Sequence, residues 1–137
     1  MGATETVAQF VTTLKAADIP QEALRRARTA LLDCIGCAVA GAKYSSSGLL
    51  LDFIRDCGGA PQATVMGTNL RTSAPDAALA NGMLAHADET DDAYYLALVH
   101  PGCAVVPAAR YGLQRYAVSP HRSRSESDRT ASRSAPA

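Results

Sequence analysis

The chain has 137 residues, of which 47% are hydrophobic and 19% charged, and its formal net charge is zero. This length suffices for one domain with a hydrophobic core but hardly for two. The neutral charge balance argues against nucleic acid or an anionic membrane as a partner. The sequence has no apolar run of about eighteen residues and no signal-peptide pattern at its start. We therefore expect a cytoplasmic protein whose four cysteines are free thiols.

Apolar residues recur at helical spacing in the first part of the chain. The first predicted helix covers residues 4–15. Its apolar stripe consists of Val7, Phe10, Val11 and Leu14. A second helix is predicted to carry Pro20 in its first turn and to have Gly41 as its C-cap. Because this second helix is rich in small residues, we expect it to be the central, buried helix of the fold.

A third helix is predicted at 49–57, followed by a short extended piece at 63–66. The next helix has a clear start signal, with Ser73 as N-cap and Asp76 at the capping-box position. This helix is predicted to run to His86. The pattern as a whole predicts an all-α fold.

The last predicted helix covers 103–113, with Pro107 tolerated only near its start. From 119 to 137 the chain contains no aliphatic residue larger than alanine, and Ser, Arg, Pro and Ala dominate. Such a segment buries too little apolar surface to fold. We therefore predict a partial helical domain at 1–116 and a disordered tail at 117–137.

Two cysteines, Cys34 and Cys37, form a Cys-x-x-Cys pattern inside the second predicted helix. A redox pair is normally preceded by a strand, and a zinc site needs further ligands, and the sequence supplies neither. We therefore interpret both cysteines as small residues of the core.

Acids and histidines gather between the last two predicted helices. They are His86, Asp88, Glu89, Asp91, Asp92 and His100. Negative charge at the C-terminal end of a helix is unfavourable, which favours a functional role. The Pro-Gly pair after His100 is predicted to place that histidine beside a helix N-terminus, where carboxylates bind.

Several functions fit this cluster. It suits a divalent metal site, or general acid–base chemistry on a small polar substrate. Asp88 with Asp91 or Asp92 has the helical spacing that chelates magnesium in diphosphate chemistry. A charged surface turn and a non-catalytic helical interaction fragment also remain open.

A set of motifs in a fixed order resembles the MmgE/PrpD family, which includes 2-methylcitrate dehydratase and cis-aconitate decarboxylase. The motifs are Leu-Leu-Asp-Cys-Ile-Gly-Cys-Ala-Val-Ala-Gly at 31–41, Ala-Leu-Ala-Asn-Gly at 78–82, His86 leading to Asp91-Asp92, His-Pro-Gly at 100–102 and Val-Val-Pro-Ala-Ala at 105–109. The resemblance implies a helical domain that packs against a smaller α/β domain in a homodimer. It also implies acid–base chemistry on small di- or tricarboxylic acids without an iron–sulfur cluster.

The resemblance also implies roles for individual residues. His86, Asp91, Asp92 and His100 match the family pattern, and Glu89 stands where the family has an aspartate. We expect Glu89, Asp91, Asp92 and His100 to be catalytic and His86 to bind substrate, with no cofactor and no metal.

Three neighbouring positions depart from the family pattern. Thr90 replaces an aromatic residue, Ala93 replaces a threonine and Tyr94 replaces a common histidine. The loss of the threonine removes a hydroxyl that is available to bind substrate.

The change in composition near Arg110 is the largest departure, because family members continue there with further helices and a second domain. We expect a frameshifted or fragmentary gene product with little or no catalysis. The sequence does not decide between dehydration, decarboxylation and epimerisation, or between the possible carboxylic acids. The alternative hypothesis is a magnesium-dependent diphosphate enzyme that uses Asp88 and Asp92. The sequence lacks the second aspartate-rich motif that such an enzyme normally needs.

Overall fold

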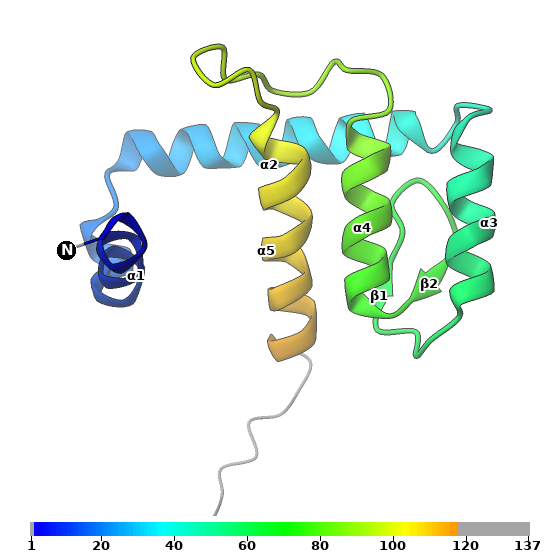
Figure 1. Ribbon diagram of the computed structural model, residues 1–137, viewed down its shortest axis with the longest axis horizontal. Coiled ribbons are helices and arrows are strands. Elements are labelled where there is room, and N and C mark those ends of the chain that lie inside the picture. The colour runs from blue at the N-terminus through cyan, green and yellow to red at the C-terminus, as the bar shows by residue number, and fades with distance from the viewer. Residues whose placement is uncertain (1, 118–137) are drawn as a thin grey trace, which may run out of the picture.

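A computed structural model describes residues 2–117, with side chains to residue 113. The helices are α1 (Ala3–Thr13), α2 (Gln21–Gly41), α3 (Ser47–Cys57), α4 (Ala74–Ala85) and α5 (Pro101–Ala117), with a 3₁₀ turn η1 (Ala16–Asp18) and the strands β1 (Ala63–Thr64) and β2 (Arg71–Thr72). About 63% of the described residues are helical, which confirms the predicted fold class. In Figure 1, α2 runs horizontally across the view, α5, α4 and α3 lie side by side below it, and the segment between α4 and α5 loops above it.

The centre of the fold is α4. This helix packs against α2, α3 and α5 and against both strands. Its buried residues are Ala74, Ala77, Ala80, Asn81, Leu84 and Ala85. In α2, by contrast, only Cys34, Ala38 and Gly41 are buried, all in its second half. The prediction that α2 is the central, buried helix was therefore wrong.

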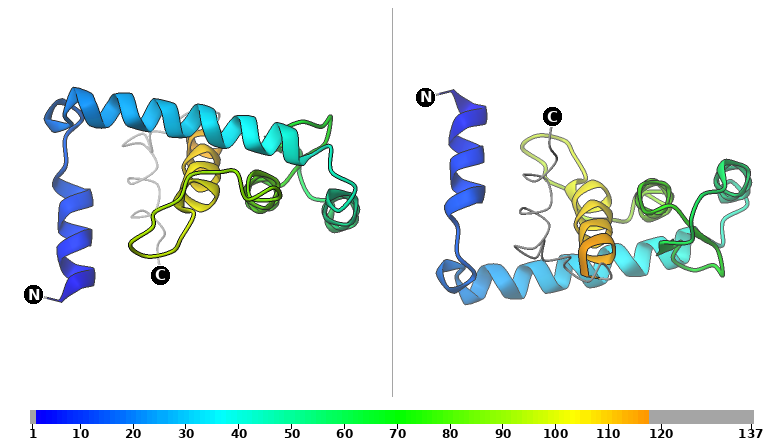
Figure 2. Two further views of the ribbon diagram at one scale, coloured as in Figure 1. Left: turned by 90° about the horizontal axis from the view of Figure 1, so that it is seen from above. Right: turned by 90° about the horizontal axis from the view of Figure 1, so that it is seen from below.

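The amphipathic helix predicted near the start is α1, but its apolar stripe does not contact the core. Val7, Phe10, Val11 and Leu14 are all exposed, and no residue of α1 is buried. Figure 2 shows α1 projecting from the first residues of α2, away from α3 and α4. Amphipathic spacing therefore predicted the helix correctly but not its surroundings.

Two glycines allow the helices to approach each other closely. A Cβ atom at Gly41 would lie 2.0 Å from the carbonyl oxygen of Leu84, and one at Gly82 would lie 2.6 Å from that of Cys103. Gly41 is the last residue of α2, and its C-cap is Ala42. The prediction that Gly41 is the C-cap of α2 was therefore wrong. A glycine is needed at this position because the backbone of α4 lies too close for a side chain.

Pro107 lies inside α5, beyond the first turn in which it was expected. Proline has no N–H, so the carbonyl four residues earlier loses its helical partner. That carbonyl belongs to Cys103, the group that lies against Gly82. The backbone of α5 thus contacts α4 where its own hydrogen-bond ladder is interrupted.

A short antiparallel hairpin packs on α4 and is held by one amide side chain. Ala63 pairs with Thr72 and Thr64 with Arg71. The buried Asn81 accepts a hydrogen bond from the Met66 N–H at 2.7 Å and donates to the Thr64 carbonyl at 3.0 Å. The sequence predicted the first strand of this hairpin but not its partner.

The local signals at the helix ends have mixed outcomes. Ser73 is the N-cap of α4 and accepts a hydrogen bond from the Asp76 N–H at 3.3 Å, as predicted. Pro20 is the N-cap of α2 and lies outside its first turn. The predicted tail at 117–137, apart from Ala117 at the end of α5, lies outside the described residues. Within residues 2–117, no helix combines the length and apolarity needed to cross a membrane.

Candidate active site

The segment between α4 and α5 brings His86 and His100 together. His86 is the C-cap of α4, and His100 directly precedes Pro101, the first residue of α5. The segment turns back on itself through an antiparallel bridge between Tyr94 and Val99. As a result, the two imidazole rings lie with their centroids 4.7 Å apart and their planes tilted by 57°.

Asp91 lies between the two histidines and is almost completely buried. Its Oδ1 atom is 3.0 Å from the Nδ1 atom of His86 and 3.2 Å from that of His100. The Asp91 side chain is 1% exposed, against 42% for His86 and 30% for His100. The contact with His86 is a hydrogen bond, whereas His100 Nδ1 makes a close approach without hydrogen-bond geometry.

The charge of Asp91 is stabilised by the histidines. Burial by itself would raise the pKa of the Asp91 carboxyl, but the hydrogen bond from His86, a backbone hydrogen bond and the charges of His86 and His100 lower it overall. Among the described residues, no lysine or arginine forms an ion pair with Asp91. Asp91 is therefore ionised at neutral pH, and its carboxylate lies against the two imidazoles.

Asp92 contacts the start of α5. Its Oδ1 atom accepts a hydrogen bond from the Gly102 N–H at 2.8 Å. A Cβ atom at Gly102 would lie 2.3 Å from that oxygen, so the glycine makes room for the carboxylate. A carboxylate at a helix N-terminus is stabilised by the helix dipole. The sequence predicted an unfavourable interaction of the acidic cluster with the C-terminal end of α4. Asp92 avoids it, because its carboxylate lies at the N-terminal end of α5 instead.

The helical spacing assumed for magnesium chelation is absent. Helix α4 ends at Ala85, and residues 86–100 form turns and loops. Asp88 is exposed, and Asp92 is already engaged with the Gly102 N–H. The premise that Asp88 and Asp92 share one helix face was therefore wrong.

Glu89 stands apart from the histidine pair. It is exposed and has a φ of 51°, an unusual left-handed conformation for a residue with a side chain. Among the described residues its side chain makes no hydrogen bond or ion pair. Backbone strain of this kind is often found at functional sites.

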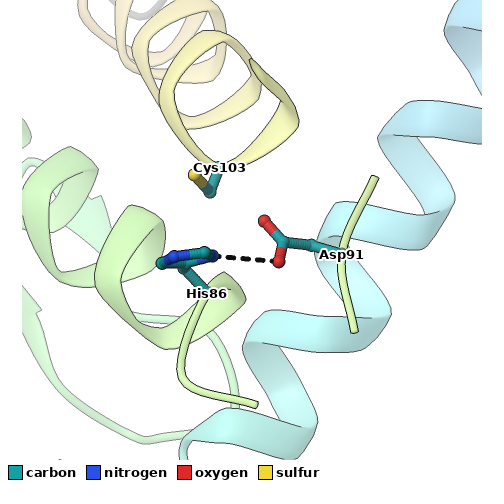
Figure 3. Close-up of side chains that lie close together, drawn as sticks. All are labelled: His86, Asp91 and Cys103. Carbon is teal, nitrogen blue, oxygen red and sulfur yellow. Dashed lines mark hydrogen bonds and ion pairs between the residues drawn. The ribbon is translucent and has the colours of Figure 1, made fainter. Parts of the chain in front are cut away.

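Cys103 belongs to the cluster, and the sequence reasoning missed it. One ligand atom each from His86, Asp91 and Cys103 lie within 4.8 Å of one another. Figure 3 shows the Asp91 carboxylate facing both other side chains, from the connecting segment toward α4 and α5. Burial, followed by the charge of Asp91, raises the pKa of the Cys103 thiol. Its position three residues after His100, at the start of a helix, was the available signal.

A separate cleft of about 520 Å³ opens beside Asp92 and along the first half of α2. Its lining residues are Glu22, Arg25, Arg26, Thr29, Ala30, Asp33 and Asp92. Both arginines form ion pairs with Glu22, so their charges are already partly compensated. Among the lining residues, only Asp92 belongs to the segment that carries the candidate site.

Comparison with known proteins defines the class of the protein. The profile described as the MmgE/PrpD N-terminal domain matches residues 5–128, so the chain belongs to the MmgE/PrpD family. The matched range extends into the segment 117–137, for which the sequence predicts a separate tail.

One similar protein is the cis-aconitate decarboxylase-like protein oryM of Aspergillus oryzae. The two are 34% identical over 105 residues, which is 77% of this chain and 22% of that protein. The chain thus spans about a fifth of the length of the relative that it matches.

Proposed function

We propose that this chain contributes the acid–base part of a lyase site that acts on a small di- or tricarboxylic acid. The observation that carries the proposal is the buried Asp91 carboxylate between the imidazoles of His86 and His100. Family membership and the similarity to a cis-aconitate decarboxylase-like protein support the substrate class. For Asp91 and His100 the family resemblance implies catalysis, and for His86 it implies substrate binding.

In this proposal the histidines divide the work. Asp91 accepts a hydrogen bond from His86 Nδ1, which leaves Nε2 of the neutral ring free as an acceptor. An adjacent carboxylate also stabilises the cationic form of an imidazole. His100 is proposed to transfer a proton to or from the substrate, and His86 to bind a substrate carboxylate in its cationic form, in which Nε2–H is a donor.

The proposed reaction requires only proton transfers and one bond cleavage. In a dehydration, a base removes a proton from the carbon beside a carboxylate, and the hydroxyl on the next carbon leaves as water after protonation. In a decarboxylation, carbon dioxide leaves and the resulting carbanion is protonated. The dehydration requires groups that accept and donate a proton, and the decarboxylation requires one that donates a proton; histidine can do both near neutral pH.

The acidic residues have supporting roles in the same proposal. Asp91 orients the imidazoles, and Asp92 holds the start of α5 next to His100 through the Gly102 N–H. Glu89, which is exposed on the same connecting segment, is proposed to contact the substrate. The proposal for the family protein also includes a homodimer and a cytoplasmic location, which the four free thiols suit.

Ligand titration followed by NMR of the imidazole groups tests the proposal. The chain has three histidines, so each ring signal can be assigned by substitution. We expect cis-aconitate and 2-methylcitrate to shift the signals of His86 and His100. Asp91→Asn is expected to weaken binding by at least about tenfold, since it removes the charge that stabilises the imidazolium.

Asp56→Asn, a substitution of an exposed acid on α3, serves as the matched control and should leave binding unchanged. Turnover of both acids is measured on the same samples, together with His100→Ala. Histidine signals that no carboxylic acid shifts, or equal binding by the Asp91 and Asp56 variants, would contradict the proposal. Light scattering of the same samples measures whether the chain forms dimers.

A further inference from the structure

The cluster around Asp91 presents three different kinds of metal-binding atom. His86 offers an imidazole nitrogen, Asp91 a carboxylate oxygen and Cys103 a sulfur, all within 4.8 Å of one another. They come from the end of α4, the connecting segment and the first turn of α5 (Figure 3). His100 Nδ1 lies 3.2 Å from the same carboxylate. Four potential ligands thus converge from three parts of the chain.

A second observation is independent of this convergence. The Oδ2 atom of Asp91 and the Nδ1 atom of His100 are buried and have no hydrogen-bond partner among the described residues. Folded proteins rarely leave buried polar atoms unsatisfied, because each carries a desolvation penalty. In Figure 3 the oxygen of Asp91 that does not contact His86 lies on the side of Cys103. The side chains of Asp91 and Cys103 therefore face each other across an unsatisfied, buried carboxylate oxygen.

We propose that His86, Asp91 and Cys103 bind a divalent cation of the Zn²⁺ type, with His100 as a fourth ligand. A mixed set of nitrogen, oxygen and sulfur atoms suits Zn²⁺ and similar borderline cations. Magnesium and calcium prefer oxygen atoms alone. The cation would take the same His86, Asp91 and His100 side chains that the proposed lyase function uses, so the metal-bound chain would not carry out that acid–base chemistry. Cation binding itself is tested without any substrate.

The distances are compatible with a tetrahedral site after small side-chain movements. Bonds of about 2.0–2.3 Å place the ligand atoms of tetrahedral zinc about 3.3–3.8 Å apart. The span of 4.8 Å in the present cluster therefore has to close by about 1 Å. His86 is partly exposed and can make this adjustment by rotating its side chain. Cys103, whose thiol now donates to the His100 carbonyl at 3.0 Å, releases its proton to solvent when it coordinates the cation.

Cobalt(II) provides the direct test, because its absorption reports both the ligands and the geometry of a zinc-type site. The full chain is stripped of metal with a chelator, reduced, and titrated with Co²⁺. We expect one Co²⁺ per chain, a thiolate-to-cobalt charge-transfer band and the intense visible bands of four-coordinate cobalt. Zn²⁺ should remove these bands stoichiometrically, and Mg²⁺ in excess should not.

Substitutions identify the ligands. Cys103→Ser should abolish the charge-transfer band, while the matched control Cys57→Ser, at an exposed thiol on α3, should keep it. Asp91→Asn and His86→Ala should each weaken Co²⁺ binding by at least about tenfold. Circular dichroism of each variant separates loss of a ligand from loss of the fold, and Cys103→Ser, which keeps a small polar side chain, is the most conservative of the three ligand substitutions.

Three results would overturn the proposal. The first is the absence of stoichiometric Co²⁺ binding by the folded wild-type chain. The second is a charge-transfer band that persists in Cys103→Ser or disappears in Cys57→Ser. The third is tight Co²⁺ binding that neither Asp91→Asn nor His86→Ala weakens. A carboxylate-binding signal in the histidine NMR experiment would be unaffected by any of these results, so the two proposals fail separately.

Discussion

Replacing Gly41 by alanine tests whether close contact between α2 and α4 holds the fold together. The new Cβ atom would lie 2.0 Å from the Leu84 carbonyl oxygen and 2.9 Å from its carbon, whereas real Cβ atoms essentially never approach another atom within 3.0 Å. The obstacle is the backbone of α4, which no side-chain rotation can move. The two helices therefore have to separate by about 1 Å.

The expected loss of stability combines two opposing effects. Overpacking of a tight core typically costs about 1–3 kcal/mol, and a rigid backbone contact places Gly41→Ala at the upper end of that range. Alanine is favoured over glycine in a helix by about 1 kcal/mol, which offsets part of the cost. We therefore expect a net loss of about 2 kcal/mol, or a decrease of about 10 °C in melting temperature for a domain of this size.

Gly36→Ala is the matched control, because the same change is made in the same helix at a position with no atom within 4 Å of the new Cβ. We expect this variant to be stabilised by up to about 1 kcal/mol through helix propensity alone. Urea unfolding followed by circular dichroism at the helical wavelength measures both variants. If Gly41→Ala is as stable as Gly36→Ala, close contact between α2 and α4 does not limit the stability of the fold.

Three further predictions concern other parts of the chain. Asn81→Ala leaves the buried Met66 N–H and the partly buried Thr64 carbonyl without their partner, so it should cost about 2–4 kcal/mol in urea unfolding, whereas Asn69→Ala, at an exposed position, should cost almost nothing. Gly102→Ala places a methyl group 2.3 Å from the carboxylate that caps α5, so it should lower the melting temperature and perturb the neighbouring histidine NMR signals; unchanged signals would contradict the capping role. Burial raises the pKa of the Cys34 thiol to about 11, so at about pH 8 it stays protonated and should resist iodoacetamide in the folded chain, while the exposed Cys57 reacts. Mass spectrometry after limited alkylation measures this order, and early labelling of Cys34 would contradict its burial.

The sequence predicted those features of the fold that depend on neighbouring residues. Helix periodicity and the capping signal at Ser73 involve positions three or four residues apart. The helices at 3–13, 21–41, 47–57 and 74–85 were accordingly predicted close to their observed bounds. The gathering of acids and histidines, with the order of the surrounding motifs, indicated the family that the comparison confirms.

The tertiary structure decided which of these residues meet. It placed Asp91 between His86 and His100, added Cys103 to them and directed Asp92 to the start of α5. No sequence pattern specifies such contacts, because they depend on the path of the segment 86–100 and on how α5 packs against α4. The structure thereby turned a run of acids into residues with separate roles.

The amino-acid sequence by itself determined the helices, the N-cap of α4 and the family, because these depend on local spacing and on the order of motifs. Only the tertiary structure decided that α4, and not α2, is the central helix. The reason lies in two backbone contacts, Gly41 with Leu84 and Gly82 with Cys103, which bring three helices together where side chains are absent. In the sequence, a glycine at such a contact looks the same as the exposed Gly36, because the neighbour that requires it lies far away along the chain.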